Sequence, residues 1–387
     1  MISRLAEKLI HELAEQFPVV LILGPRQCGK TTLAKHFLDG EYFDLERPAD
    51  QDIFLDDIEF ALNQFKHPLI LDEAQTLPEL FPVLRSLVDP NRQLNGRYFL
   101  LGSVNPSRIR QISESLAGRV GIVELTPFLF PELPSKTTDL TALWLKGGYP
   151  DAFNAANASH WQRWQENYAR TLIERDIPAH GGKLSAIQIR RLMGMIANLH
   201  GGLLNASDLG RSLGISYHTV NTYLDLMEGH FLIRRLPPYH PNIKKRIVKS
   251  PKLYIRDTGV LHYLLGISKN RDLLSSPKRG SSWEGLLIEH ILALEGLTQP
   301  GGQSFFFRTH AGAEVDLIID RGHETVGFEF KCAVSVSRKD WHNLAACIQD
   351  GVITKGMVVY MGTRNYDAAH KIRVVNAEKL LIHLLNG

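Results

Sequence analysis

Residues 24–32 combine two glycines, a lysine and two threonines in an order that suits phosphate binding. They match the pattern GxxxxGK[ST], in which glycine lets backbone N–H groups turn around a phosphate. Lys30 is expected to reach the β- and γ-phosphates, Thr31 to ligate Mg²⁺, and Thr32 to contact the α-phosphate. The nine positions predicted to bind ATP are Gly24, Pro25, Arg26, Gln27, Cys28, Gly29, Lys30, Thr31 and Thr32.

The segments on either side of this loop are those that a nucleotide site needs. The apolar residues 18–23 predict a buried parallel strand, and residues 33–38 favour a helix. The loop therefore ends at a helix N-terminus, which carries partial positive charge. Cys28 lies inside the loop; we interpret it as a small loop residue, the alternative being a redox gate with a lowered thiol pKa.

A second motif could supply hydrolysis. Residues 68–75 form an apolar strand that ends in Asp72 and Glu73. Asp72 is expected to hold Mg²⁺ through water, and Glu73 to act as the general base toward the attacking water. The alternative is a strand end with two solvated acids.

Two further residues are candidates for sensing or completing the phosphate site. The strand predicted at 97–103 ends in Ser103, a candidate sensor of the γ-phosphate, with Asn105 as the second choice. Arg119 directly follows Gly118 and could be an arginine finger that completes a neighbouring subunit's site. The alternative for Arg119 is a surface residue.

The C-terminal third carries a pattern that could bind a second metal. Asp316 precedes Glu329 and Lys331 on the next predicted strand, where the last two share one face. This arrangement resembles the PD-(D/E)xK restriction-endonuclease-like fold, in which Asp316, Glu329 and Glu284 would bind Mg²⁺ and Lys331 would position or activate water. The spacing from Gly280 to Glu284 also resembles archaeal Holliday-junction resolvases. The alternative is a hairpin whose charges are only exposed.

The middle of the chain predicts a nucleic-acid contact. Residues 203–236 favour a helix, a glycine-containing turn and a second helix, as in a winged-helix domain. Residues 231–256 then hold eight basic residues and no acid, whereas 41–60 hold eight acids and one arginine. A basic segment beside a helix-turn-helix is expected at a phosphodiester backbone. The alternative for the helix-turn-helix is a rigid connector, and those for the basic segment are a solvated hairpin and a surface that docks the acidic segment of the next subunit. The predicted DNA contacts are Tyr217, His218, Asn221, Lys244, Lys245, Arg246 and Lys249.

These motifs together resemble prokaryotic AAA-type ATPases with a C-terminal domain of unknown function. The resemblance starts at 24–33, 71–75 and 115–120 and continues to 329–331, so it covers nearly the whole chain. It implies an oligomeric ATPase, often a ring. We therefore expect a homo-oligomer, with a hexamer among the candidates.

Length and composition agree with a soluble protein of several domains. The 387 residues carry a net charge of +3 and three cysteines without metal-ligand spacing. The N-terminal residues predict an amphipathic helix, not a signal peptide, and no apolar run could span a bilayer. We expect a cytoplasmic protein without a membrane partner.

The sequence thus predicts an α/β fold with four segments. They are an AAA-type P-loop core with a parallel sheet at 1–135, a helical lid or connector at 136–182, a winged helix with a basic hairpin at 183–256, and a PD-(D/E)xK nuclease-like domain at 257–387. The expected function is an ATP-driven motor or remodeller of DNA, branched or single-stranded, in branch migration or repair. The alternatives are a nucleotide-dependent switch with a protein partner and an ATP-gated, Mg²⁺-dependent nuclease.

Overall fold

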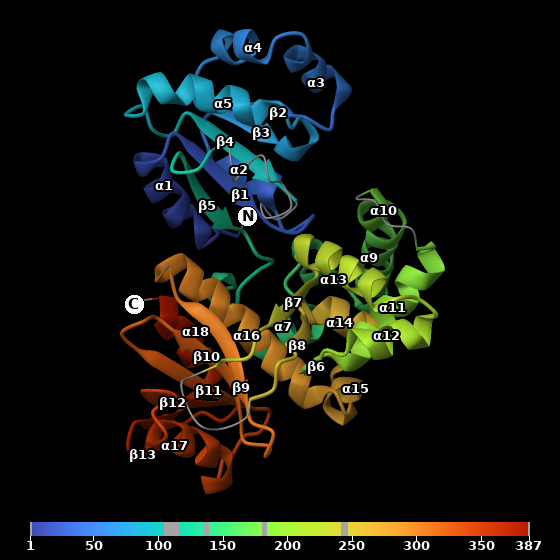
Figure 1. The fold of residues 1–387 in the computed structure, drawn as a ribbon, viewed down its shortest axis with the longest axis vertical. Coiled ribbons are helices and arrows are strands. Elements are labelled where there is room, and N and C mark those ends of the chain that lie inside the picture. The colour runs from blue at the N-terminus through green and yellow to red at the C-terminus, as the bar shows by residue number, and fades with distance from the viewer. Residues whose placement is uncertain are drawn as a thin grey trace. The chain divides into compact units, whose positions relative to one another are not determined.

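The computed structural model describes residues 2–103, 116–134, 139–179, 184–240, 247–299 and 301–385. Residue contacts divide the chain into two compact units (Figure 1). Unit 1 consists of Met1–Phe128 with Gly229–Phe231, and unit 2 of Leu129–Glu228 with Leu232–Gly387. Asn105, the second sensor candidate, lies outside the described residues.

Unit 1 is built on a five-stranded parallel sheet with the order β2-β3-β4-β1-β5. Its central strands are apolar throughout, because both of their faces are buried. The sheet confirms the predicted nucleotide-binding core. Its strands are β1 (Val19–Leu23), β2 (Glu41–Asp44), β3 (Leu69–Asp72), β4 (Tyr98–Gly102) and β5 (Val120–Glu124).

The strand order brings the loops that follow β1, β3 and β4 to one edge of the sheet in unit 1. The chain leaves β1 for α2, forms β2 and β3, and returns through β4 to the side of β1. In a parallel sheet, ligands bind outside the carboxyl ends of the strands where the order reverses. The helices of this unit are α1 (Ala6–Gln16), α2 (Lys30–Phe37), α3 (Pro48–Leu55), α4 (Ile58–Gln64) and α5 (Leu80–Val88), with the short η1 (Ala74–Thr76) and η2 (Asp89–Asn91).

The first part of unit 2 is mainly helical and shares one core from Tyr149 to Leu265. Helices α12 (Ala206–Leu213) and α13 (Tyr217–Gly229) form the predicted helix-turn-helix around Gly214, whose φ is 69°. The antiparallel sheet β6-β8-β7 follows, and the predicted boundary at 256 falls inside the shared core. The other elements are α7 (Leu140–Lys146), α8 (Pro150–Phe153), α9 (Ala158–Thr171), η5 (Leu172–Asp176), α10 (Ile177–Ala179), α11 (Ala186–Leu199), β6 (Gly202–Leu203), β7 (Ile233–Leu236), β8 (Lys252–Ile255), α14 (Thr258–Leu264) and α15 (Asn270–Ser275).

The second part of unit 2 is a six-stranded mixed sheet with the order β13-β14-β12-β11-β10-β9. The strands β9, β10 and β11 form an antiparallel meander, and β11, β12 and β14 run parallel. Helix α16 packs against β11 and α18. The elements are η4 (Phe130–Glu132), α16 (Arg279–Thr298), β9 (Gln303–Arg308), β10 (Glu314–Asp320), β11 (Thr325–Lys331), η6 (Arg338–Trp341), α17 (His342–Gln349), β12 (Lys355–Tyr360), β13 (Tyr366–Ala369), β14 (Ile372–Asn376) and α18 (Ala377–Leu385).

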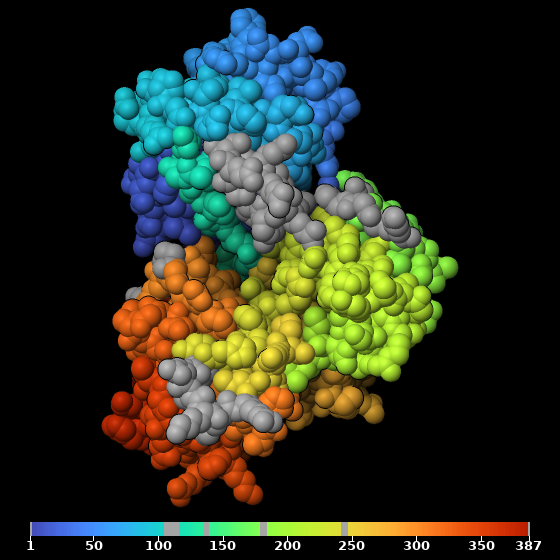
Figure 2. Space-filling model, in the orientation of Figure 1, coloured from blue at the N-terminus to red at the C-terminus, as the bar shows by residue number. Residues whose placement is uncertain are grey.

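The space-filling view in Figure 2 shows the same colour order from the N-terminus to the C-terminus. Among the described residues, every helix is too short or too polar to cross a lipid bilayer.

Candidate functional site: a phosphate cradle and an acidic cluster

The loop after β1, residues 24–32, is called the P-loop from here on. A Cβ at Gly24 would lie 2.1 Å from Leu125 O, so only glycine fits there. Gly29 has φ 103°, which glycine adopts without strain, and it precedes α2 without a side-chain cap. Arg4 stabilises the loop, because its Nη1 donates a hydrogen bond to Cys28 O at 3.0 Å. Because the N-cap residue Gly29 has no side chain, it does not cap the N–H groups of the first turn of α2. A phosphate site requires N–H groups in this state.

Lys30 links the P-loop to the end of β4. Its buried ammonium donates to Gly24 O at 2.9 Å, Pro25 O at 3.0 Å and Ser103 Oγ at 3.1 Å. Ser103 in turn donates to Glu73 Oε1 at 2.6 Å. The predicted lysine, sensor and general base thus form one continuous chain of hydrogen bonds.

Glu73 adopts an uncommon backbone conformation at the end of β3. Its φ of 51° lies in the left-handed region, which costs a non-glycine residue about 1 kcal/mol or more. Gln75 Nε2 donates to the second carboxylate oxygen of Glu73. Because Ser103 holds the first oxygen, both oxygens of Glu73 have donors, and the carboxylate has a fixed direction. Gln75 was not among the predicted site residues.

Asp72 connects the P-loop to β2. The Thr31 hydroxyl donates to Asp72 Oδ2 at 2.6 Å, which joins the two predicted Mg²⁺ ligands. The Tyr42 hydroxyl donates to the same oxygen at 2.7 Å. Burial and the Asp72 carboxylate raise the pKa of Tyr42 well above its usual range, so its hydroxyl keeps its proton. The carboxylate, hydroxyl and P-loop amides fit Mg²⁺ with a nucleotide triphosphate.

We expect Tyr42→Phe to raise the Mg²⁺ concentration for half-maximal ATP hydrolysis about tenfold, because a donor that orients a metal-binding carboxylate is lost. A Mg²⁺ titration of the hydrolysis rate measures this shift. Tyr366→Phe removes an exposed hydroxyl of unit 2 and serves as the control. An unchanged Mg²⁺ requirement in Tyr42→Phe would show that the Tyr42 hydroxyl is not needed to position Asp72, which also accepts from Thr31 and from the Glu73 N–H.

Three other predicted residues of unit 1 have partners inside the chain. Arg119 Nε and Nη2 donate to the two carboxylate oxygens of Asp89 at 2.7 and 2.9 Å. Cys28 is fully buried and its thiol donates to Leu125 O at 3.2 Å. Burial raises the pKa of the Cys28 thiol, which is the opposite of what the redox-gate alternative requires. Arg26 is paired with Glu46.

Unit 2 brings the three acids of the nuclease-like pattern together with Glu314, which was not among the predicted site residues. We call Glu284, Glu314, Asp316 and Glu329 the acidic cluster. A lysine from β8 lies among them: Lys252 Nζ is 2.9 Å from Glu284 Oε1 and 2.5 Å from Glu314 Oε1. It is also 3.8 Å from Asp316 Oδ1. Lys252 is 2 % exposed and was not among the predicted site residues.

Further contacts of the acidic cluster come from β8, β9 and β11, among them the ion pair of Arg308 Nη1 with Glu314 Oε2 at 3.2 Å. The Tyr254 hydroxyl donates to Glu284 Oε1. The Phe330 N–H donates to Asp316 Oδ2 at 2.9 Å, and Lys331 Nζ is 2.8 Å from Glu329 Oε1. Glu329 Oε2 is buried without a hydrogen-bond partner.

The charged groups of the acidic cluster shift one another's pKa values. Burial by itself would lower the pKa of Lys252, but the carboxylates of Glu284, Asp316 and Glu314 raise it overall. Burial and the charges of Glu329 and Glu284 raise the pKa of Asp316 well above its usual range. Burial raises the pKa of Glu329 to about 6, against the opposing effect of Lys331.

The structure brings the predicted metal ligands Glu284, Asp316 and Glu329 together, but with the ammonium of Lys252 against two of them. In the part of the chain that the structure describes, no three His, Cys, Asp or Glu side chains are arranged to hold a metal ion. Mg²⁺ requires oxygen ligands at about 2.0–2.1 Å in octahedral geometry, whereas here the ammonium of Lys252 contacts the acids. The residues do not fit a metal, because a cation of the chain itself lies between them.

Four of the eight basic residues at 231–256 form ion pairs within the chain. Arg234 and Arg256 both bond to the buried Glu289 of α16. Arg235 bonds to Asp225 and Glu228, and Lys252 lies in the acidic cluster. Half of the eight basic residues thus face acids from other parts of the sequence. These four side chains therefore contribute less positive charge to a DNA-binding surface than the composition of the stretch implies.

The other predicted DNA contacts have separate positions. Lys244, Lys245 and Arg246 lie outside the described residues. Tyr217 and His218 are exposed at the start of α13, with ring centroids 3.9 Å apart, and Asn221 is half-buried on the same helix. Lys249 is exposed.

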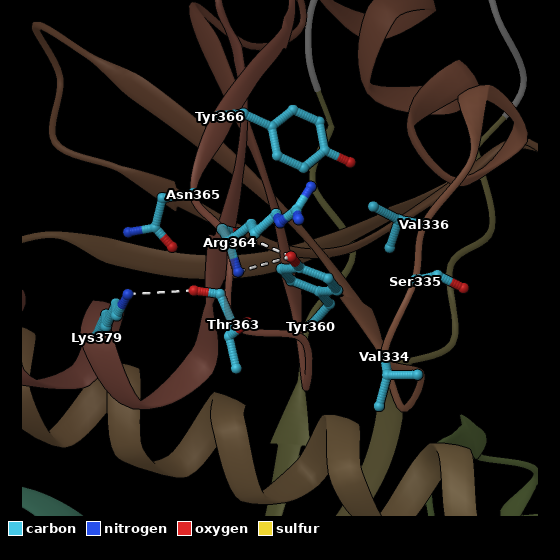
Figure 3. Close-up of a pocket in the computed structure, with 9 residues that line it drawn as sticks. All are labelled: Val334, Ser335, Val336, Tyr360, Thr363, Arg364, Asn365, Tyr366 and Lys379. Atoms are coloured by element: carbon cyan, nitrogen blue, oxygen red, sulfur yellow. Dashed lines mark hydrogen bonds between the residues drawn. The ribbon is translucent and has the colours of Figure 1, made fainter.

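A cavity of about 890 Å³ lies beside the carboxyl ends of β11 and β12. In the view of Figure 3 the Arg364 guanidinium lies between the rings of Tyr360 and Tyr366. Lys379 Nζ donates to Thr363 O at 3.1 Å. Two cationic side chains and two phenol rings therefore line one cavity, a combination that sequence patterns did not indicate. Its lining residues are Val334, Ser335, Val336, Tyr360, Thr363, Arg364, Asn365, Tyr366 and Lys379.

Comparison with known protein families divides the chain into three successive segments. An AAA domain matches residues 16–134, a domain of unknown function (DUF8612) matches 137–271, and another (DUF4143) matches 279–380. The parallel sheet, the P-loop and the AAA match together define an α/β P-loop ATPase of the AAA type, which confirms the predicted fold class.

Two curated relatives are similar over nearly the whole chain. The uncharacterized proteins Rv2008c of Mycobacterium tuberculosis and Mb2031c of Mycobacterium bovis are each 38% identical over 371 residues, which is 94% of this chain and 81% of theirs. The chain belongs to the family of these two proteins. The AAA domain of this chain indicates a nucleotide-dependent ATPase.

Two solved structures are distantly similar. One is a signal transduction ATPase with a tetratricopeptide repeat sensor, PH0952 from Pyrococcus horikoshii, at 14% identity and a TM-score of 0.29, covering 76% of this chain and 47% of that one. The other is VC1899 from Vibrio cholerae, at 10% identity and a TM-score of 0.21, covering 95% and 96%. These scores are too low to bear on the function.

Proposed function

We propose that this protein hydrolyses ATP with Mg²⁺ and uses the hydrolysis cycle as a switch. The observation that carries the proposal is the continuous chain of hydrogen bonds from Lys30 through Ser103 to Glu73. It links the residue expected at the γ-phosphate to the residue expected at the attacking water. A change at the phosphate is thereby coupled to the ends of β3 and β4.

Each residue of the site has a separate task in this proposal. The P-loop amides and Lys30 bind the phosphates, and Asp72 and Thr31 would hold Mg²⁺, which neutralises phosphate charge when bound. Glu73 accepts a proton from the attacking water at its carboxylate. When ATP is bound, Lys30 would turn from the Gly24 and Pro25 carbonyls to the phosphates, which changes its hydrogen bond to Ser103.

A second candidate function is action on nucleic acid, which the cavity of unit 2 favours. Cationic side chains suit a phosphate, and an aromatic ring suits a stacked base. Arg364 and Tyr366 offer both, and Tyr217 with His218 offers a second exposed aromatic pair. A single-stranded or branched DNA partner therefore stays part of the proposal, in branch migration or repair, although the basic stretch adds less charge than its composition implies.

ATP hydrolysis by the purified chain tests both candidates in one experiment. We expect Mg²⁺-dependent phosphate release that EDTA stops. Single-stranded DNA, junction DNA and no DNA are compared at equal protein concentration and at two salt concentrations, because phosphate contacts weaken with salt. Stimulation by DNA supports a nucleic-acid motor. Equal turnover in all three supports a switch with a protein partner, and no turnover contradicts the first proposal.

The cavity makes a prediction of its own. We expect Arg364→Ala and Tyr366→Ala each to weaken binding of a fluorescent single-stranded DNA about fivefold or more, since base stacking and phosphate contacts contribute at this level. Arg373→Ala is the matched control, because Arg373 is an exposed arginine of the adjacent β14. Equal affinity in all variants would exclude the cavity as the DNA contact.

Assembly into a ring is a further part of the proposal. In this chain Arg119 is held by Asp89, so its use as an arginine finger requires the ion pair to open. The native mass of the protein with and without an ATP analogue tests assembly directly. A monomer under both conditions would remove the role of Arg119 in a neighbouring site.

A further inference from the structure

The acidic cluster combines features that normally belong to a metal-binding site. Its four acids come from α16, β10 and β11, and two of them, Asp316 and Glu329, are at least nine-tenths buried. Buried carboxylates are costly unless a cation or hydrogen-bond donors compensate them. Something with positive charge must therefore be present among these acids.

Lys252 supplies that charge from a different part of unit 2. It is the first residue of β8, in the three-stranded sheet that follows the helix-turn-helix, and Tyr254 lies on the same face of that strand. The ammonium contacts Glu284, Glu314 and Asp316, and Tyr254 donates to Glu284. A single buried side chain thus bridges acids of a helix and a strand.

We infer that Lys252 takes the place of a divalent cation in the acidic cluster, so that the C-terminal sheet carries a metal site that its own chain keeps closed. An ammonium and a hydrated Mg²⁺ cannot occupy the same position among Glu284, Glu314 and Asp316. Removing Lys252 leaves four acids against two cations, Lys331 and Arg308, and hence an excess of negative charge. Hard divalent cations such as Mg²⁺ and Mn²⁺ prefer that oxygen-ligand set.

Two features separate Lys252 from the second lysine of the cluster. Lys331 is 28% exposed at its side chain and, among the described residues, forms an ion pair with Glu329 alone, whereas Lys252 is 2% exposed and contacts three acids. Glu329 also keeps one buried oxygen without a hydrogen-bond partner. That oxygen is available to a cation once the ammonium is gone. We therefore expect substitution of Lys252 and substitution of Lys331 to have different effects on binding of a divalent cation.

Binding of Mn²⁺ to the nucleotide-free full-length chain tests the inference. All samples carry Asp72→Asn, which removes the carboxylate expected to hold Mg²⁺ in unit 1, and free Mn²⁺ is followed by electron paramagnetic resonance. We expect Lys252→Met to gain one Mn²⁺ site at least about tenfold tighter than any in the parent. Lys331→Met, the matched control, should gain none of comparable affinity. Adding Glu329→Gln to Lys252→Met should weaken the new site.

Three results would overturn the inference. One is a stoichiometric Mn²⁺ site in the parent that Glu329→Gln removes. Another is a folded Lys252→Met chain that binds Mn²⁺ no better than the parent does. The third concerns folding: if Lys252→Met is unfolded in EDTA, Mn²⁺ should restore its cooperative thermal transition, and failure to do so would show that a divalent cation cannot replace the ammonium. None of these measurements involves ATP hydrolysis.

Discussion

Glu73→Gln is expected to slow ATP hydrolysis about 100-fold or more, because a positioned general base contributes at least that factor. Glutamine keeps the size of the side chain and can still contact Ser103 and Gln75, but it cannot accept the proton. ATP should bind as before, since Glu73 is not part of the P-loop. Single-turnover hydrolysis and binding of a fluorescent ATP analogue, measured on one preparation, separate the two effects.

Lys30→Ala is the complementary variant. Lys30 bonds to two P-loop carbonyls and to Ser103, so its loss should abolish tight ATP binding as well as hydrolysis. Ser103→Ala should fall between the two variants, with binding intact and hydrolysis reduced, because Glu73 loses one of its two donors. If Glu73→Gln hydrolyses ATP at the normal rate, another residue is the base and the proposed switch loses its main support.

Glu289→Ala is expected to lower the free energy of unfolding by about 3 to 5 kcal/mol, the usual cost of removing one partner of a buried ion pair. Glu289 is buried on α16 and accepts from both Arg234 and Arg256. Removing the carboxylate leaves two guanidinium groups without this partner. Urea unfolding followed by circular dichroism measures the change. Glu166→Ala, which removes a half-exposed partner of Arg170, should change it by no more than about 0.5 kcal/mol.

The Glu289 carboxylate should also make the stability of the fold depend on pH. Although burial opposes ionisation, Arg234 and Arg256 lower the pKa of Glu289 from 4.5 to about 2. A lowered folded-state pKa stabilises the fold above the unfolded pKa, and this contribution is lost as the pH falls from about 4.5 toward 2. The parent should therefore lose more stability between pH 5 and 3 than Glu289→Gln does. Parallel pH profiles of the two proteins would contradict this assignment.

The ATP site was predictable because its chemistry is local. The P-loop is continuous in sequence, and Asp72 and Glu73 end an apolar strand. Both motifs can therefore be recognised from consecutive residues. Tyr42 and Gln75 were not predictable in the same way. Tyr42 reaches Asp72 only because β2 pairs with β3 in parallel register, and a tyrosine in an edge strand carries no motif.

The sequence by itself determined the class of protein, the location of its phosphate cradle and the identity of the acids beside it, because these depend on neighbouring residues. Tertiary structure decided how the charges are used. The basic stretch at 231–256 has no acid of its own, and only folding brings Glu289, Glu228 and Glu284 to its side chains. Likewise, the acids of the C-terminal pattern are adjacent as expected, but Lys252 reaches them from a distant strand, since burial makes a nearby counter-charge necessary.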